Sequence, residues 1–262
     1  MNHSDDLDVD DASANGQPLV EHLIELRACL LRSLVAVLIV FLGLFSFAGA
    51  IHEFVAAPLE QVLVGGNTMI AIDPAAPFLT PFKMALYASI YFSVPYIIYQ
   101  LWSFVAPALY LKEKRIALPL LVSSVVLFYA GTAFAYFVVF PLVFQFFASV
   151  VPDSVAMMTD ISSYMSFVIK LFFAFGIAFE IPIVTILLIY SGAITAQDLG
   201  KKRPYVVVSC FVLGMLMTPP DVISQLLLAF PMWLLFEAGL FFGKLMIREK
   251  NKNDTDTSAS SD

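Results

Sequence analysis

Six apolar stretches, separated by short polar segments, make up most of this 262-residue chain. A helix rises 1.5 Å per residue, so roughly 20 apolar residues are needed to cross a hydrocarbon core about 30 Å thick. The stretch at 205–218 has only 14 residues and ends at two prolines, which predicts a short hairpin with the sixth stretch. A re-entrant hairpin is the alternative. The six stretches lie at about 28–50, 82–105, 116–140, 163–191, 205–218 and 222–243.

The pattern therefore predicts an all-α polytopic membrane protein with six transmembrane helices. Prolines lie in or beside several of these spans, and each one removes a backbone hydrogen-bond donor. We expect bent helices that enclose a concave surface rather than a straight bundle. Glycine and proline also punctuate the segment 46–80, where we expect short helices that cap the outer face. The span prolines are Pro95, Pro119, Pro141, Pro182 and Pro231.

Composition agrees with a membrane protein, since 60% of the residues are hydrophobic, 13% are charged and the mean hydropathy is +0.87. The net charge of −7 comes from the two ends: residues 1–18 contribute −5 and residues 251–262 contribute −2. The low pI therefore gives no indication of nucleic-acid binding. We predict disordered tails at 1–17 and 247–262 around a membrane domain at 18–246.

Lysine and arginine positions predict the orientation of the chain. Twelve of the 14 basic residues lie in four clusters, and the intervening loops at about 51–81, 141–162 and 218–222 contain none. Because positively charged loops stay in the cytoplasm, both termini are expected there. A multi-pass protein of a bacterial plasma membrane is the simplest interpretation.

Two carboxylates lie beside cations at the expected cytoplasmic surface. Glu25 and Arg27 belong to an amphipathic helix that leads into the first span, and Glu113 is embedded in the basic loop after the second span. Phe104 precedes that loop and can supply an apolar wall. Glu25 and Arg27 are also typical of a solvated interfacial helix, and the cations around Glu113 are also typical of a positively charged inner loop. The sequence alone therefore leaves open whether these residues form a binding site.

Glu180 stands within the fourth apolar stretch, far from either end of it. A carboxylate at this depth costs about 2.5–3.5 kcal/mol on insertion scales and normally faces the protein interior. Gly176, one turn earlier, is expected to leave room for a partner backbone. Lys170 is on a different helical face and is not an obvious counter-ion. We therefore expect a functional acid that is protonated or hydrogen-bonded within the bundle.

Polar residues also flank the turn of the short hairpin. Thr218 and Gln225 can hydrogen-bond a polar residue on the helix of another protein, while a locally satisfied turn with Asp221 capping the sixth span is equally compatible. Cys29 and Cys210 are expected to be packing residues without a disulfide. No metal cluster, nucleophile motif or phosphate-binding glycine loop is present, so we expect neither an enzyme nor a cofactor.

Several motifs occur in a characteristic order: HLIELR, PFLTPFKM, YQLWSFVAPALY, LKEKR, AFAYFVVFP, FGIAFEIP, KKRPY and MTPPD. With them the chain resembles the TatC family, the six-span subunits of the bacterial twin-arginine protein translocase, over about residues 17–245. The resemblance implies a concave, glove-like helical fold. It also implies recognition of twin-arginine signal peptides on folded cargo at the cytoplasmic face, and transport driven by the proton-motive force.

Carried over by motif, the resemblance places Glu25, Arg27, Phe104 and Glu113 in the signal-peptide site. It implies two single-span partners, TatA and TatB, that dock along the fifth and sixth spans near Met215, Thr218 and Gln225, and self-assembly within a complex in the lipid bilayer. Glu180 and Asp221 match characteristic acidic positions of the family. The alternative is a proton-coupled small-solute transporter with Glu180 as the proton carrier, although the chain lacks the internal repeat typical of such proteins.

Overall fold

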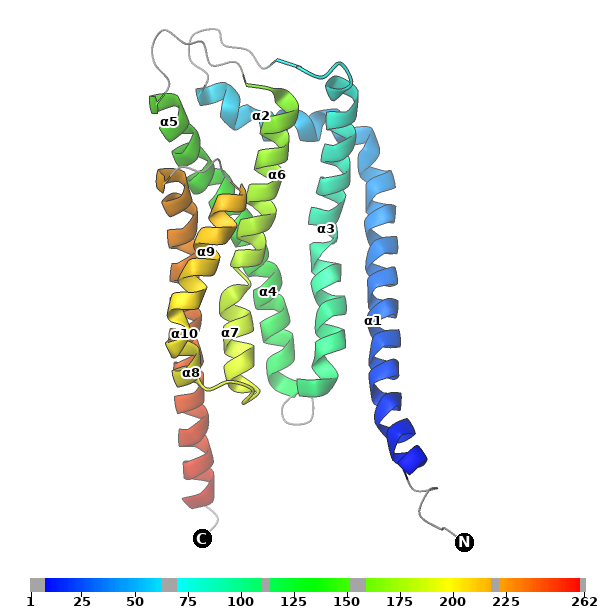
Figure 1. Cartoon of the computed structure of the whole chain (residues 1–262), viewed down its shortest axis with the longest axis vertical. Coiled ribbons are helices and arrows are strands. Elements are labelled where there is room, and N and C mark those ends of the chain that lie inside the picture. The colour runs from blue at the N-terminus through cyan, green and yellow to red at the C-terminus, as the bar shows by residue number, and fades with distance from the viewer. Residues whose placement is uncertain (1–7, 63–69, 110–113, 151–158, 218–221, 260–262) are drawn as a thin grey trace. The chain divides into compact units, whose positions relative to one another are not determined.

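The computed structural model describes residues 8–62, 70–109, 114–150, 159–217 and 222–259. This part of the chain is helical, and its one β-bridge pairs Ile70 with Asp160. The helices are labelled in Figure 1. They are α1 (Asp8–Leu44), η1 (Phe45–Phe47), α2 (Ala48–Val62), α3 (Ala76–Leu109), α4 (Lys114–Phe134), η2 (Ala135–Val139), α5 (Phe140–Val150), α6 (Ile161–Ala178), α7 (Ile181–Tyr190), α8 (Ala196–Lys201), α9 (Arg203–Met217) and α10 (Val222–Ala259).

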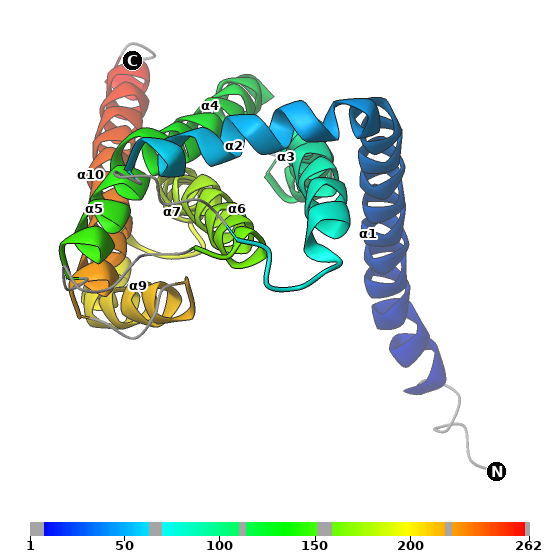
Figure 2. The same cartoon turned by 90° about the horizontal axis from the view of Figure 1, so that it is seen from above.

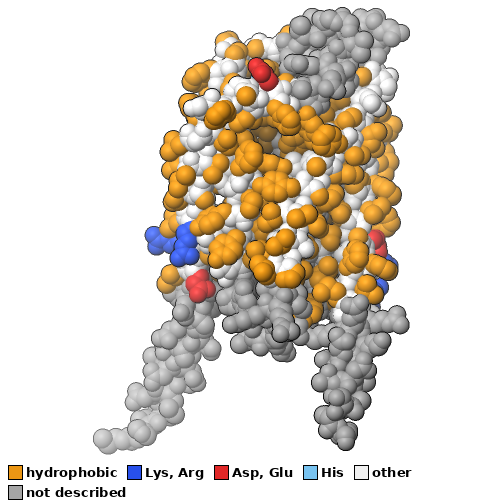
Figure 3. Space-filling view, turned by 180° about the vertical axis from the view of Figure 1, so that it is seen from behind, with side chains coloured by type: hydrophobic (Ala, Val, Ile, Leu, Met, Phe, Trp, Pro, Cys, Tyr) orange, Lys and Arg blue, Asp and Glu red, His pale blue; other side chains and the backbone are white. Residues whose placement is uncertain are grey.

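Five helical segments of the described chain are long and apolar enough to cross a membrane, and α9 is a shorter apolar helix of 15 residues. Five of the six predicted stretches correspond to these long segments, and the stretch at 205–218 corresponds to the shorter α9. On the face drawn in Figure 3, hydrophobic side chains cover most of the described surface and charged ones are few. The five long segments are Leu23–Ala56, Ala76–Phe104, Leu118–Val150, Ile161–Tyr190 and Val222–Met246.

The chain divides into two compact units. The first comprises Met1–Ser46 and Leu86–Leu121, and the second comprises Phe47–Ala85 and Val122–Asp262. Most of the buried apolar residues belong to the second unit, where Phe140, Phe175 and Leu228 are almost completely buried. Within it, α7 and α9 run beside α10 and pack against it (Figure 1).

Two glycines allow α10 to approach α7 closely. A Cβ atom on Gly239 would lie 2.8 Å from the Cα atom of Pro182, and one on Gly243 would lie 2.7 Å from a methyl carbon of Ile189. Gly239 and Gly243 are four residues apart and so lie on one face of α10. Small residues at this spacing let helices pack closely in a membrane, where there is no hydrophobic force between them.

The fourth predicted span corresponds to the segment Ile161–Tyr190, and near Pro182, where a bend was expected, its helix is interrupted. Helix α6 ends at Ala178, Phe179 and Glu180 form a turn, and α7 begins at Ile181. Pro182 stands in the first turn of α7, where its missing N–H has no helical partner to lose. The proline thus starts a new helix rather than bending the old one.

The third span is irregular at the equivalent depth, since a π-helical segment, η2, joins α4 to α5 immediately before Pro141. The backbone is helical from Asp8 and again as far as Ala259, so α1 and α10 extend into the polar tails. An apolar helix can continue into polar sequence because its hydrogen bonds are local to the backbone.

The predicted outer cap includes a helix, α2, which lies crosswise to α6 and contacts α5 and α6 (Figure 1 and Figure 2). The Tyr164 hydroxyl donates a hydrogen bond to the Val55 carbonyl across 3.2 Å. Two backbone hydrogen bonds join Ile70 to the start of α6. The Ile70 N–H donates to the Thr159 carbonyl, and the Ile161 N–H donates to the Ile70 carbonyl, both at 3.0 Å.

Candidate functional site

Glu180 lies at the break between α6 and α7 and is the N-cap residue of α7. Its N–H donates to the Ile177 carbonyl at 3.0 Å, and its carbonyl accepts from the Val184 N–H at 2.9 Å. The backbone of Glu180 therefore belongs to both helices. Its side chain makes no capping hydrogen bond and is left for other contacts.

The Glu180 carboxyl group is half-buried among apolar residues. The Ser124 hydroxyl, on α4 and 1% exposed, is a hydrogen-bond partner of this carboxyl. The other oxygen, Oε1, is buried and has no hydrogen-bond partner among the described residues. Lys170 is exposed on α6, as expected for a residue that is not the counter-ion. A carboxyl group with one hydroxyl partner and one oxygen without a partner is a candidate to take up or release a proton, or to bind a further polar group.

The space beside Gly176 is filled from within the chain, which corrects the expectation that a partner helix approaches there. A Cβ atom on Gly176 would lie 2.6 Å from the ring of Phe128. Gly131 makes the reciprocal approach, since its Cβ atom would lie 2.5 Å from the Phe175 carbonyl oxygen. The two glycines let α4 and α6 cross closely just before Glu180.

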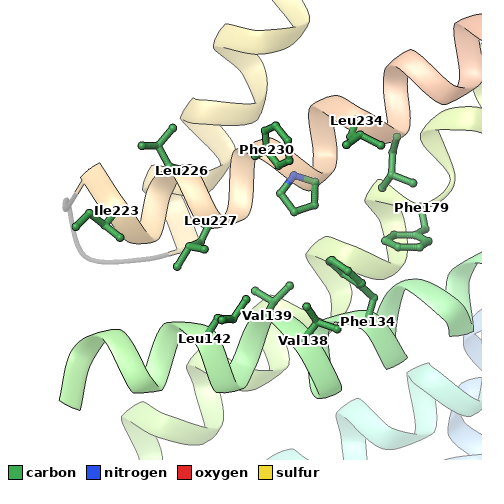
Figure 4. Close-up of a pocket in the computed structure, with 12 residues that line it drawn as sticks. Phe134, Val138, Val139, Leu142, Phe179, Ile223, Leu226, Leu227, Phe230 and Leu234 are labelled. Atoms are coloured by element: carbon green, nitrogen blue, oxygen red, sulfur yellow. The ribbon is translucent and has the colours of Figure 1, made fainter. Parts of the chain in front are cut away.

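An apolar groove of about 650 Å³ lies near the same helix break (Figure 4). One wall comes from α10 and the other from the end of α4, η2 and α5, with Phe179 at one end. All of its lining residues are apolar: Phe134, Val138, Val139, Leu142, Phe179, Ile223, Leu226, Leu227, Phe230, Pro231, Leu234 and Leu235. The groove can accept hydrocarbon but offers no side-chain hydrogen bond.

The residues predicted for the cytoplasmic surface lie in the first unit. Glu25 and Arg27 are exposed on α1 near the start of the first long apolar segment. Phe104 is half-buried at the end of the second such segment. Two consecutive spans cross a membrane in opposite directions, so these residues belong to the same side. Glu113 lies outside the described residues.

The short hairpin shows how one of its predicted polar residues is engaged. Gln225 donates a hydrogen bond from Nε2 to the Phe211 carbonyl at 2.8 Å, which ties α10 to α9. Gln225 is therefore engaged within the chain, while the predicted cap by Asp221 stays a prediction. Met215 is 51% exposed on α9. Thr218 and Asp221 lie outside the described residues.

Two further charged residues were not singled out from the sequence. Glu237, within the apolar part of α10, accepts a hydrogen bond from Arg203 Nη2 at 2.6 Å. Asp160 caps α6 by accepting from the Ser163 N–H at 2.9 Å, and it also accepts from the Ile72 N–H at 3.3 Å. A lone carboxylate in an apolar run is the signal that could have found Glu237, by the same reasoning that found Glu180.

The hydrogen bonds from Ser163 hold the pKa of Asp160 below its usual value, because they favour the ionised carboxylate. Asp160 therefore remains charged at neutral pH. The described residues contain no group of three or more His, Cys, Asp or Glu side chains that could hold a metal ion. The charged groups of this structure thus offer ion pairing and hydrogen bonding.

These features define a multi-pass helical membrane protein with a carboxyl group at an intramembrane helix break. The family model described as Sec-independent protein translocase protein (TatC) matches residues 21–231, and the chain belongs to this family. A protein of this description from Azotobacter chroococcum mcd 1 is 59% identical over 88% of the chain and 91% of the relative. The Escherichia coli K12 relative is 55% identical over 88% of the chain and 90% of its own length.

The fold agrees with a solved structure described as the twin-arginine translocase receptor TatC. The TM-score is 0.78 at 40% identity, over 86% of this chain and 98% of the solved one. A protein translocase component is thus the function of this family, and a small-solute transporter is not favoured. The match also agrees with the all-helical fold class expected from the apolar pattern.

Proposed function

We propose that this protein is the signal-peptide-binding core subunit of a twin-arginine translocase that exports folded proteins using the proton-motive force. The observation that supports this most directly is the 59% identity to a translocase protein over 88% of the chain, together with an exposed Glu25 and Arg27 in the HLIELR motif. In this proposal both termini lie on the cytoplasmic side of a bacterial plasma membrane, which the basic clusters favour.

The proposed peptide site uses carboxylates for the two arginines of the signal. A guanidinium presents a planar fork of N–H donors that a carboxylate can accept at two positions, and lysine lacks this geometry. In this proposal Glu25 and Glu113 accept these donors and Phe104 packs against the apolar part of the peptide. Arg27, two residues after Glu25, contributes to the same surface.

The proposed partners are the single-span proteins TatA and TatB. The exposed side of α9 is apolar, with Val208 61% and Leu216 64% exposed, as a surface for another transmembrane helix requires. Met215 lies on this helix, and Thr218 and Gln225 flank the turn that follows. Because Gln225 Nε2 is engaged with Phe211, its amide oxygen is the atom we propose for a partner donor. We further propose that the protein self-assembles within the complex. In the same proposal Asp221, between α9 and α10 in the sequence, is a functional acid.

The function is tested by measuring how the purified protein binds a twin-arginine signal peptide and a matched twin-lysine peptide. Glu25→Ala and Glu113→Ala should each weaken binding of the arginine peptide about tenfold or more, since a hydrogen bond to a charged group contributes about 1.5–3 kcal/mol. Glu53→Ala is the matched control, because Glu53 is an exposed carboxylate on α2 outside the proposed site. Unchanged binding, or an equal loss for the lysine peptide, would contradict the carboxylate site.

A crosslinking scan extends this test to the partners. Photoreactive residues at Glu25 and Glu113 should capture the signal peptide, while one at Thr218 should capture a single-span partner. One at Glu180 tests whether the helix break meets either of them. Capture of the peptide at Thr218 alone would move the recognition site away from the cytoplasmic carboxylates.

A further inference from the structure

A second groove lies between α9 and α10 at the basic end of α9. Its volume is about 580 Å³, and it is lined by Arg203, Pro204, Val207, Trp233 and Glu237. Its walls are therefore apolar and aromatic, while its polar groups are one cation and one carboxylate. Trp233 and Glu237 are four residues apart and share a face of α10.

The ion pair in this groove lies within the membrane-spanning part of α10. Glu237 precedes Lys244 by a segment of about 10 Å along the helix axis. A carboxylate at this position needs a partner, and Arg203 Nη2 supplies it at 2.6 Å. Glu237 in turn fixes the direction of the guanidinium.

The guanidinium is not saturated by this contact. Arginine has five N–H donors, and the contact with Glu237 engages Nη2. The Arg203 side chain is 49% exposed, so the remaining donors can reach a further acceptor. Lys201 and Lys202 precede it, and Asp198 is engaged by Lys201 at 2.9 Å. Within the groove Arg203 and Glu237 balance each other, and Lys201, Lys202 and Asp198 beside it bring the net charge of this region to +1.

We propose that this groove binds an anionic phospholipid, with the lipid phosphate on Arg203 and an acyl chain along Val207 and Trp233. Two oxygens of a phosphate can accept two N–H groups of one guanidinium, as the two oxygens of a carboxylate do. Trp233 lies within the apolar segment of α10 and offers the face of its indole ring to an acyl chain. The net positive charge favours an anionic headgroup over a zwitterionic one.

The lining distinguishes a lipid from a protein segment as the occupant. The groove places the Arg203 cation beside an apolar wall, and a phospholipid likewise carries its phosphate next to its acyl chains. It lies at the end of a short helix, where a headgroup can approach Arg203. This lipid site does not depend on the proposed export function, because it rests on the charges and lining of α9 and α10 alone.

The test uses fluorescence quenching at Trp233. The chain has two tryptophans, so a Trp102→Phe variant of the full chain leaves Trp233 as the single emitter. It is reconstituted in phosphatidylcholine vesicles that contain brominated phosphatidylglycerol or brominated phosphatidylcholine. Quenching should show about fivefold preference for phosphatidylglycerol, the equivalent of about 1 kcal/mol for one cation near the surface.

Arg203→Gln in this background should bring the preference to about one, whereas Lys170→Gln, which removes a cation outside the groove, should leave it unchanged. Val207→Phe keeps every charge but fills the groove. It should reduce quenching by both brominated lipids, and it serves as the test if Arg203→Gln does not fold. Circular dichroism and gel filtration establish that each variant is folded.

Three results would overturn the lipid site. The first is equal quenching by the two brominated lipids in the parent protein. The second is an equal loss of preference in Lys170→Gln and Arg203→Gln, which would mean that the effect is only one of total charge. The third is loss of the preference on adding inorganic phosphate at unchanged ionic strength, which would make the site one for free anions.

Discussion

Helix α6 carries a carboxylate at each end, and the two are held in opposite ways. Asp160, at the start of the helix, accepts hydrogen bonds from the Ser163 N–H, the Ser163 hydroxyl and the Ile72 N–H. Glu180, just past its end, has Ser124 as a partner on one oxygen and no partner among the described residues on the other. Both oxygens of the Asp160 carboxylate accept hydrogen bonds, whereas one oxygen of Glu180 has no hydrogen-bond partner among the described residues.

The contrast separates a structural acid from a candidate functional one. A negative charge at a helix N-terminus is favoured by the helix dipole, so Asp160 stabilises α6 where it stands. Glu180 lies between the C-terminus of α6 and the N-terminus of α7, whose dipoles act on it in opposite directions, and its buried Oε1 has no hydrogen-bond partner among the described residues. Removing Asp160 should therefore weaken the fold, whereas removing Glu180 should weaken function and spare the fold.

The largest effect is expected from Glu180→Ala. Transport of a folded cargo in vesicles should fall at least about tenfold, while binding of the signal peptide and the midpoint of thermal unfolding stay unchanged. Glu180→Gln keeps the shape and a partner for Ser124 but cannot ionise. If the glutamine variant transports normally, the function does not need an acid, and if either variant loses peptide binding, Glu180 belongs to the recognition site.

The second-largest effect is expected from Gly131→Ala. This change tests whether packing, rather than hydrogen bonding, stabilises the Glu180 end of α6. Gly131→Ala would put a Cβ atom 2.5 Å from the backbone oxygen of Phe175, and it should destabilise the protein by about 1–3 kcal/mol. Gly43→Ala is the matched control, because no atom lies within 4 Å of its added Cβ, and it should stabilise by about 0.5–1 kcal/mol. Denaturant unfolding in detergent measures both, and similar curves for the two variants would contradict the close crossing.

Asp160→Ala should lower the thermal midpoint by less than Gly131→Ala does. The change removes the acceptor of the Ser163 and Ile72 N–H groups, but both bonds are exposed and water can replace it. Asp160→Asn keeps an acceptor oxygen at the helix cap and should retain most of the stability. An alanine variant as stable as the parent would mean that the cap contributes nothing.

The smallest effect is the pH dependence of Asp160. Its pKa is lowered in the folded state by the Ser163 hydrogen bonds, so its contribution to stability is complete above the unfolded pKa of about 3.9 and is lost as the pH falls through the folded value. The stability difference between the parent protein and Asp160→Ala should thus stay constant from pH 7 to 5 and shrink below about 4. A difference that already shrinks between pH 7 and 5 would contradict the assigned direction.

The spans could be predicted from the sequence because the bilayer imposes a length and an apolar composition on each of them. The short fifth span was predicted for the same reason. The break at Phe179 and Glu180 was missed, although Pro182 was visible in the sequence, because a proline can either kink a helix or begin a new one. That choice depends on what packs around it.

The candidate site was predictable only in part. Glu180 was found from the free energy of placing an acid among apolar residues, and the same reasoning applied to Glu237 would have found the second carboxylate. Their partners Ser124 and Arg203 could not be found, because both lie on other helices. The contact between Gly176 and Phe128 could not be predicted either. The sequence shows that residue 176 is small, but not which side chain packs against it.

The bridge between Ile70 and Asp160 has a consequence for how the chain is made. Its hydrogen bonds join segments about 90 residues apart, with Ile72 donating to the carboxylate of Asp160. During synthesis the first of these segments emerges well before the second, because the second and third spans lie between them in the chain. Their hydrogen bonds can form only once the start of the fourth span has reached the same side of the membrane as Ile70, so they form late in the insertion of the first four spans.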